Sequence, residues 1–186
     1  MRTFIAVPLP PEVRALLGEM QKTLRSFSAN VKWTAIPSIH LTLKFLGEIE
    51  PASLPRLVEL LRAAAASEHP FSLHLHGLGG FPNLHSPRVI WCGLDGELPS
   101  LESLQKKVET ACVDAGFAPE DRPFHPHLTL GRVRDRTNLQ PLLDYIKIGS
   151  ALEHTFAVRE FNIYQSILRP QGALYSVLER IELQGD

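Results

Sequence analysis

The chain has 186 residues, of which 44% are hydrophobic and 21% are charged, and its formal net charge is −1. This length suits one domain or two small lobes with a common core, and the near-zero charge excludes a protein that coats long nucleic acid through a strong positive field. No hydrophobic run approaches the roughly 20 residues that span a bilayer, and the first residues lack a signal-peptide pattern. We therefore expect a cytoplasmic protein.

Its two cysteines, Cys92 and Cys112, are expected to be small buried side chains without a disulfide.

The first half of the chain predicts five elements from its apolar periodicity and its turn residues. In chain order they are a strand at 3–9, a helix at 13–24, a strand at 40–46, a helix at 54–61 and a strand at 71–78. The segment Gly77–Pro87 follows and contains three glycines and two prolines. Because such residues favour turns, we expect the boundary between two lobes here.

The second half predicts the same order of elements. They are a strand at 88–94, a helix at 101–111, a strand at 127–130, a helix at 139–146 and a strand at 156–164. Ser100 and Asn138 are the expected N-caps of the two helices, since their side chains can accept a hydrogen bond from the first turn. A final strand is expected at 174–183.

Nearly constant offsets relate the two halves. Arg88 follows Thr3 by 85 positions, and the helix residue Leu139 follows Leu54 by the same number. Equal spacing across several elements indicates an internal duplication. We therefore predict one bilobal domain over residues 1–186, with pseudo-repeats at about 1–80 and 88–165 and further strands near the C-terminus that complete the sheets.

The tetrapeptide His-Leu-Thr-Leu occurs twice, at 40–43 and at 127–130. In a strand, alternate residues share a face, so His and Thr would lie on one face and the two Leu on the other. His40 and His127 would then be one proton donor and one proton acceptor, because small shifts around a pKa near 6.5 can leave one ring charged and the other neutral. The hydroxyls of Thr42 and Thr129 could hold phosphate oxygens.

The two motifs and their flanks resemble the paired His-x-Thr-x motifs of the two-histidine (2H) phosphoesterases. The matching stretches are 40–47, His-Leu-Thr-Leu-Lys-Phe-Leu-Gly, and 125–132, His-Pro-His-Leu-Thr-Leu-Gly-Arg. The most similar branch is the RNA 2',3'-cyclic phosphodiesterases, also called 2'-5' RNA ligases. Residues 3–7, Gly80-Phe81-Pro82 and the region 164–178 are similar to that branch as well, so the resemblance covers nearly the whole chain.

This resemblance implies hydrolysis of RNA 2',3'-cyclic phosphate ends to 2'-phosphomonoesters without a metal or another cofactor. It implies that His40 is the proton donor to the 3' oxygen, that His127 is the base for water, and that Thr42 and Thr129 contact the phosphate. The expected partners are RNA ends or oligonucleotides with that terminus. A monomer is expected, with no membrane association and no obligate protein partner.

Three further residues are candidate substrate contacts. Lys44 shares strand parity with His40 and would add positive charge, or it is a solvated surface lysine. Arg132 lies on the opposite face from His127 by strict alternation, unless Gly131 redirects the strand. Phe45 is a candidate for base stacking, as are Phe4 and Trp33, although aromatic residues in strands usually pack in the core.

The element order alone also allows a parallel α/β sheet. The family resemblance instead favours an α+β fold, in which antiparallel sheets line a central cleft and helices lie outside. Three alternatives to the main function remain open: 2'-5' RNA ligation by the reverse chemistry, hydrolysis of another cyclic phosphate such as ADP-ribose 1″,2″-cyclic phosphate, and a non-catalytic module that binds RNA ends.

Overall fold

Three long strands, one short strand and two helices make up the first half of the chain. The computed structural model describes residues 1–149, 152–170 and 172–184. In chain order the elements are β1 (Arg2–Val7), α1 (Pro11–Arg25), β2 (Val31–Trp33), β3 (Leu41–Glu48), α2 (Leu54–Ala65) and β4 (Phe71–Phe81). The five elements predicted for this half are confirmed. Strand β2 was not predicted, because three residues are too few to show a period.

The second half contains five strands and two helices among its described residues. They are β5 (Val89–Gly96), α3 (Leu98–Asp114), β6 (His127–Val133), α4 (Leu139–Ile148), β7 (Glu153–Val158), β8 (Glu160–Arg169) and β9 (Gly172–Glu182). The single strand predicted at 156–164 is in fact two strands, and they lie in different sheets. The sequence carries a signal for this break, since its apolar residues change from even positions at Phe156 and Val158 to odd positions at Phe161 and Ile163.

Two predicted boundaries also require correction. Helix α3 begins at Leu98 with Glu97 as its N-cap, so Ser100 lies inside the first turn. Strand β4 continues to Phe81. The glycines that were expected to form a turn between two lobes therefore lie within a strand. Asn138 does precede α4, but its side chain makes no cap hydrogen bond.

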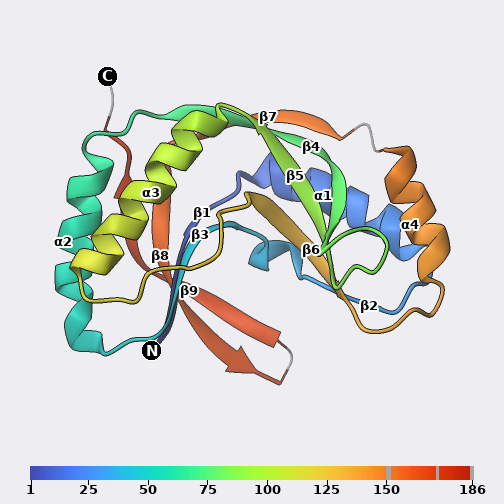
Figure 1. Ribbon diagram of the computed structural model, residues 1–186, viewed down its shortest axis with the longest axis horizontal. Helices are drawn as coiled ribbons and strands as arrows, with labels where there is room; N and C mark the ends of the chain where they lie inside the picture. The colour runs from blue at the N-terminus through green and yellow to red at the C-terminus, as the bar shows by residue number, and fades with distance from the viewer. Residues whose placement is uncertain (150–151, 171, 185–186) are drawn as a thin grey trace.

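The described strands form two sheets in which every strand pair is antiparallel, which confirms the α+β prediction. One sheet has the order β3-β1-β8-β9 and the other has the order β2-β6-β5-β4-β7. In Figure 1, α2 and α3 lie together beside one sheet, α1 and α4 lie toward the other end, and the β8–β9 hairpin projects from the body.

Each sheet contains a strand that comes from the other half of the chain. Strand β4 of the first half pairs with β5, and β8 of the second half pairs with β1. The triplets β3-β1-β8 and β6-β5-β4 therefore correspond strand for strand. This is the arrangement that two copies of a β-α-β-α-β unit give if they exchange their third strands; the duplication itself stays a prediction.

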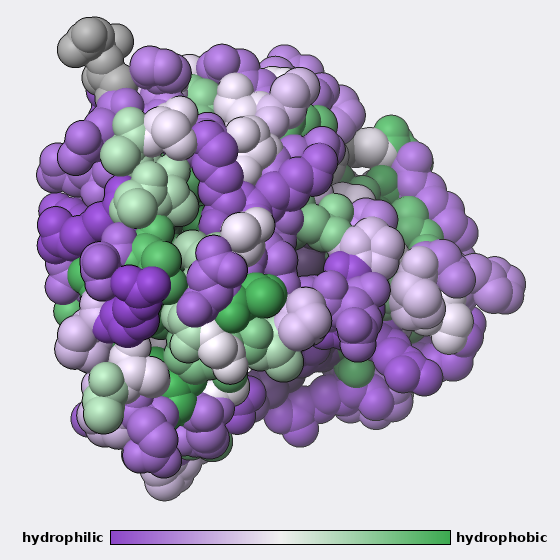
Figure 2. Space-filling model, turned by 60° about the vertical axis from the view of Figure 1, so that its left-hand side comes forward, coloured by the Kyte–Doolittle hydropathy of each residue, from purple (hydrophilic) through white to green (hydrophobic). Residues whose placement is uncertain are grey.

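One hydrophobic core connects the two sheets and the helices. Helix α1 buries Val13, Leu17 and Leu24 on one face, as its 3.6-residue period predicts. Cys92 and Cys112 are buried and unbridged, as expected. The surface in Figure 2 is mostly hydrophilic and is hollowed between its two sides. In the described part of the chain, no helix is both long enough and apolar enough to cross a membrane.

Candidate active site

His40 lies directly before the first residue of β3. Its ring stacks on Phe4 of β1 with 4.6 Å between centroids, and Tyr175 of β9 meets it edge-on at 5.3 Å. A hydrogen bond with the backbone of Ser38 also holds the ring. These contacts give His40 a defined orientation at the end of the sheet.

His127 is the first residue of β6 and is held in a similar way. Its Nδ1 atom lies 2.6 Å from the carbonyl oxygen of His125, and its ring meets Phe81 of β4 edge-on, with 4.8 Å between centroids. A carbonyl oxygen only accepts hydrogen bonds, so Nδ1 carries the hydrogen and Nε2 keeps its lone pair in the neutral ring. Each motif histidine is thus bonded to the backbone of the residue two positions earlier.

Burial lowers the pKa of both histidines. The pKa of His40 falls to about 4, mainly because its surroundings disfavour the charged ring, and the bond with Ser38 opposes this shift. The pKa of His127 is also lowered, first by burial and further by the charges of His125 and Arg132. Both rings are therefore mainly neutral at pH 7 in the free protein.

Thr42 and Thr129 occupy corresponding places in the two sheets. Thr42 pairs with Ala6 on β1, and Thr129 pairs with Trp91 on β5. Each threonine is half-buried and lies two residues after its histidine. Alternate residues of an extended chain share a face, so each hydroxyl lies on the side of its own histidine.

Both motif strands contain a β-bulge directly after the threonine. In β3 the residues opposite Ala6 and Ile5 are Thr42 and Lys44, and in β6 the pairing skips one residue between Thr129 and Gly131. One extra residue reverses the alternation that follows it. The strict parity used in the sequence analysis therefore fails beyond each threonine.

The bulge in β3 exchanges the expected places of Lys44 and Phe45. Lys44 pairs with the buried Ile5 and is itself only 4% exposed, so the prediction that it shares the face of His40 is wrong. Phe45 pairs with Phe4 and is 60% exposed on the face of Thr42. A parity argument could not find this, because the inserted residue, Leu43, looks like any other strand residue.

The bulge in β6 brings Arg132 to the face of the second motif. Arg132 pairs with Val89, which shares a face with Trp91, the partner of Thr129. The effect of its charge on the pKa of His127 agrees with this position. The redirection considered for Gly131 is therefore present. Phe45 and Arg132 each lie five residues after the histidine of their motif.

A short segment brings the two motif strands together although they belong to different sheets. Strand β2 pairs with β6, and directly after it the amide of Thr34 donates to the carbonyl of Leu130 at 2.9 Å. The buried Gln21 of α1 donates to the carbonyls of both residues, at 2.8 and 2.9 Å. The chain reaches His40 six residues after Thr34, and β3 and β6 come into contact.

Tyr175 supplies a second link between the motifs. Burial raises its pKa, and the positive charges of Arg2 and Arg132 oppose that rise. Tyr175 also contacts His40, and Arg132 acts on His127. We infer that both motifs face one cleft and that β9 forms part of its wall.

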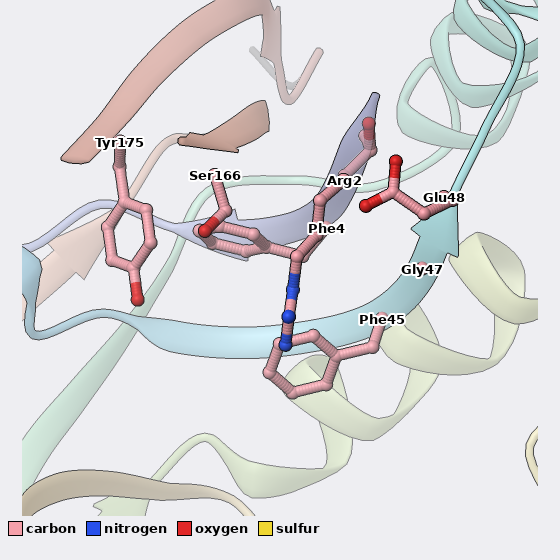
Figure 3. Close-up of a pocket in the computed structure, with 8 residues that line it drawn as sticks. Arg2, Phe4, Phe45, Gly47, Glu48, Ser166 and Tyr175 are labelled. Atoms are coloured by element: carbon pink, nitrogen blue, oxygen red, sulfur yellow. The ribbon is translucent and has the colours of Figure 1, made fainter. Parts of the chain in front are cut away.

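A pocket of about 280 Å³ adjoins the first motif. Its walls include Arg2, Phe4, Phe45, Ser166 and Tyr175, which come from four strands (Figure 3). Phe4 and Tyr175 line the pocket and also contact His40, so these rings separate the pocket from that histidine. In Figure 3 the guanidinium group of Arg2 extends toward the ring of Phe45. The pocket thus combines aromatic surfaces with the charged side chains of Arg2 and Glu48.

Two further histidines and Trp33 lie elsewhere. His74 and His76 line a separate hollow with Glu153 on the other sheet. Over residues 1–149, 152–170 and 172–184, no cluster of three or more His, Cys, Asp or Glu side chains is placed to hold a metal ion. Trp33 lies in β2 with the guanidinium group of Arg25 over its ring at 5.8 Å.

Sequence reasoning named Phe4 only as a stacking candidate and did not find that aromatic residues pack around both histidines. Tyr164 stacks on Phe4 at 5.1 Å, and Trp91 packs against Phe81 at 5.2 Å. These rings come from strands that pair across the two halves, and strand pairing cannot be read from one sequence alone. The available signal is that all four rings lie within predicted strands or beside their ends.

Comparison with known proteins gives consistent matches over the whole chain. A sequence profile described as the 2'-5' RNA ligase superfamily matches residues 9–167. A protein of Methanothermobacter thermautotrophicus named RNA 2',3'-cyclic phosphodiesterase is 33% identical, with 98% of this chain and 99% of the relative covered.

Solved structures have the same fold. The crystal structure of TT0787 from Thermus thermophilus matches with a TM-score of 0.84 and 34% identity, with 100% of both chains covered. The structure of LigT from E. coli complexed with 3'-AMP matches with a TM-score of 0.80 and 27% identity, over 99% of this chain and 98% of LigT.

Proposed function

The chain belongs to the 2'-5' RNA ligase superfamily, and we propose that it hydrolyses RNA 2',3'-cyclic phosphate ends to 2'-phosphomonoesters by paired histidine acid–base catalysis. The observation that carries this proposal is the matched geometry of the two motifs. Each presents a histidine bonded to the backbone two residues earlier, with a threonine on the same face. Two proton-transfer groups, one on each side of phosphorus, suit an in-line displacement.

In the proposed reaction, water attacks phosphorus while His127 accepts its proton. The bond from phosphorus to O3' breaks, and His40 donates a proton to the leaving O3'. The 2' ester bond stays, so the product is the 2'-phosphomonoester. Thr42 and Thr129 hold the non-bridging oxygens, where negative charge increases in the transition state. The two imidazoles supply both proton transfers, so the scheme needs no metal ion or other cofactor.

The low pKa of His40 fits the donor role if substrate binding raises it. A phosphodiester carries one negative charge, and a nearby opposite charge favours the protonated ring. The free protein at pH 7 has a neutral His40, so productive binding takes up a proton. The acid and base assignment of the two histidines rests on the family resemblance.

We propose that Phe45 and Arg132 contact the substrate and that Lys44 does not. The exposed ring of Phe45 lines the aromatic pocket, where a nucleobase could stack. Arg132 lies on the face of the second motif, where its guanidinium group could bind phosphate. We further propose that the protein acts as a cytoplasmic monomer without an obligate protein partner.

The first test is an assay in excess EDTA with a short RNA that ends in a 2',3'-cyclic phosphate. We expect conversion to the 2'-phosphate, with losses of about 100-fold or more in both His40→Ala and His127→Ala. The exposed His85→Ala is the control and should keep full activity. No conversion by the intact protein would overturn the proposed activity.

The superfamily name also points to ligation as a second candidate. In ligation, the 5' hydroxyl of a second RNA replaces water as the nucleophile. It attacks phosphorus, the bond from phosphorus to O3' breaks, O3' takes up a proton, and the retained 2' ester becomes part of a 2'-5' linkage. Adding such an RNA to the assay measures this directly. A 2'-5' joined product that needs both histidines would show that one site serves both reactions.

A further inference from the structure

Lys44 forms an almost buried ion pair that the proposed mechanism does not use. Its Nζ atom lies 2.8 Å from Oε1 of Glu109 on α3 and donates to the carbonyl oxygen of Ala118 at 2.9 Å. The Lys44 side chain is 3% exposed. The same Oε1 atom accepts a hydrogen bond from the amide of Glu120 at 2.8 Å. One carboxylate thus connects the first motif strand to the segment that leads toward the second motif.

The ion pair lies next to the bulge that determines which side chain faces the pocket. With the bulge, Lys44 points toward α3 and Phe45 is exposed in the pocket. Without it, strict alternation would place Lys44 on the cleft face and Phe45 inside. A buried ammonium group is costly unless it is paired and hydrogen-bonded. The inward position of Lys44 therefore depends on the acceptors that Glu109 and Ala118 provide.

We propose that Glu109 is a positioning residue that holds Lys44 inward, keeps the bulge in β3 and so presents Phe45 to the nucleobase of the substrate. The kinetic part of this inference rests on the proposed function, and the conformational part does not.

The second motif supports this inference, because its bulge also turns one residue inward and no charged side chain is involved. Gly131 corresponds to Lys44 in register and pairs with Trp33 of β2. A Cβ atom at Gly131 would lie 2.6 Å from Cγ1 of Val31, so the position has no room for a side chain. In β6 the inward residue is fixed by close packing, whereas in β3 it is fixed by an ion pair.

The conformational test measures the exposure of residue 45 through the reaction of Phe45→Cys with iodoacetamide. The background is low because Cys92 and Cys112 are buried, which raises the pKa of each thiol to about 12. We expect Glu109→Leu to slow labelling by about tenfold, because the unpaired Lys44 turns outward and residue 45 turns inward. Lys44→Met/Glu109→Leu should restore labelling, since no buried charge remains.

The kinetic test uses the same changes with the native Phe45. We expect Glu109→Leu to raise KM by about tenfold with kcat nearly unchanged, since base stacking is lost while His40 and Thr42 precede the bulge. The double variant should regain the original KM. Glu68→Leu is the matched control and should change neither KM nor labelling. Glu68 forms an ion pair at 2.6 Å with Lys107, which lies on α3 as Glu109 does.

Three results would overturn the inference. Equal labelling in Glu109→Leu and its parent would show that the ion pair does not hold the bulge. A double variant no better than Glu109→Leu would assign the effect to the loop at Glu120. A large KM increase in Lys44→Met alone would mean that Lys44 binds substrate directly. If the intact protein has no activity, labelling still decides the conformational part, and only the proposed function fails.

Discussion

His40 and His127 lie in surroundings that withhold a proton from them at neutral pH. His40 is enclosed by Phe4 and Tyr175, and His127 packs against Phe81. These rings orient the imidazoles and also exclude the water that would solvate a charge. Precise orientation and a low pKa therefore have the same cause in this site.

The pH dependence of kcat/KM follows from these lowered pKa values. In the active form of the free protein, one histidine is protonated and the other is neutral. The pKa values of both histidines lie below 6.5. We expect a bell-shaped profile with its maximum between about pH 4 and 6.5, and a decline of about tenfold per pH unit above it. Initial rates at low substrate concentration measure this profile. A plateau that extends through pH 7 and 8 would contradict the assignment.

Arg132→Gln provides an internal check on that profile. The positive charge of Arg132 contributes to the lowered pKa of His127. Its removal should move the limb that belongs to His127 toward higher pH, whatever its effect on substrate affinity. An unchanged profile would show that the two side chains do not interact in solution.

At the scale of the element, both motif strands have an irregular position after the threonine, where the alternation of side chains changes. The motif residues His40, Thr42, His127 and Thr129 could be placed on faces from the sequence alone, because alternation holds up to the bulge. Lys44 could not, since a bulge depends on partners in β1 and α3 that are remote in sequence. The helices were predictable because each carries its own apolar stripe. The break at Arg159 is marked only by a change in which alternate positions are apolar.

A substitution at Gly79 of β4 tests how Trp91 packs on this strand. A Cβ atom here would lie 2.2 Å from the ring of Trp91, so the indole lies directly on the glycine. We expect Gly79→Ala to lower the free energy of unfolding by about 2 kcal/mol, since Trp91 must move from its place beside Thr129. Denaturant unfolding measures the loss.

The matched control is Gly18→Ala in α1. A Cβ atom at Gly18 would meet only the Ile36 side chain at 3.8 Å. Alanine favours a helix over glycine, so this change should raise stability by about 0.5–1 kcal/mol. Equal effects of the two substitutions would mean that Trp91 does not lie on Gly79 in solution.

At the scale of the whole molecule, the element order was predictable but the pairing was not. A β-α-β-α-β order is compatible with parallel and antiparallel sheets, and only the family resemblance favoured the antiparallel form. The pairing of β4 with β5 and of β8 with β1 lies beyond local sequence patterns, because it depends on contacts between distant strands. That pairing is nevertheless what places Phe81 against His127 and Tyr164 against Phe4.

The stability of the molecule should decrease in acid because of His40. Its pKa is near 6.5 when unfolded and about 4 when folded, so the unfolded chain binds more protons between these values. We expect the free energy of unfolding to fall by about 3 kcal/mol from this residue as the pH drops from 6.5 to 4. His40→Gln should remove this component, and His85→Gln, at an exposed site, should not. Urea unfolding at several pH values measures it.

The crossed strands make the two halves of the chain interdependent. A break in the segment between Phe81 and Val89 would leave one fragment with β4 but without its partner β5, and the other with β8 but without β1. Each fragment would expose an unpaired strand edge and an open apolar face. The fragments would therefore fold only on association, and the polypeptide could be divided there into two pieces that regain the histidine pair by complementation.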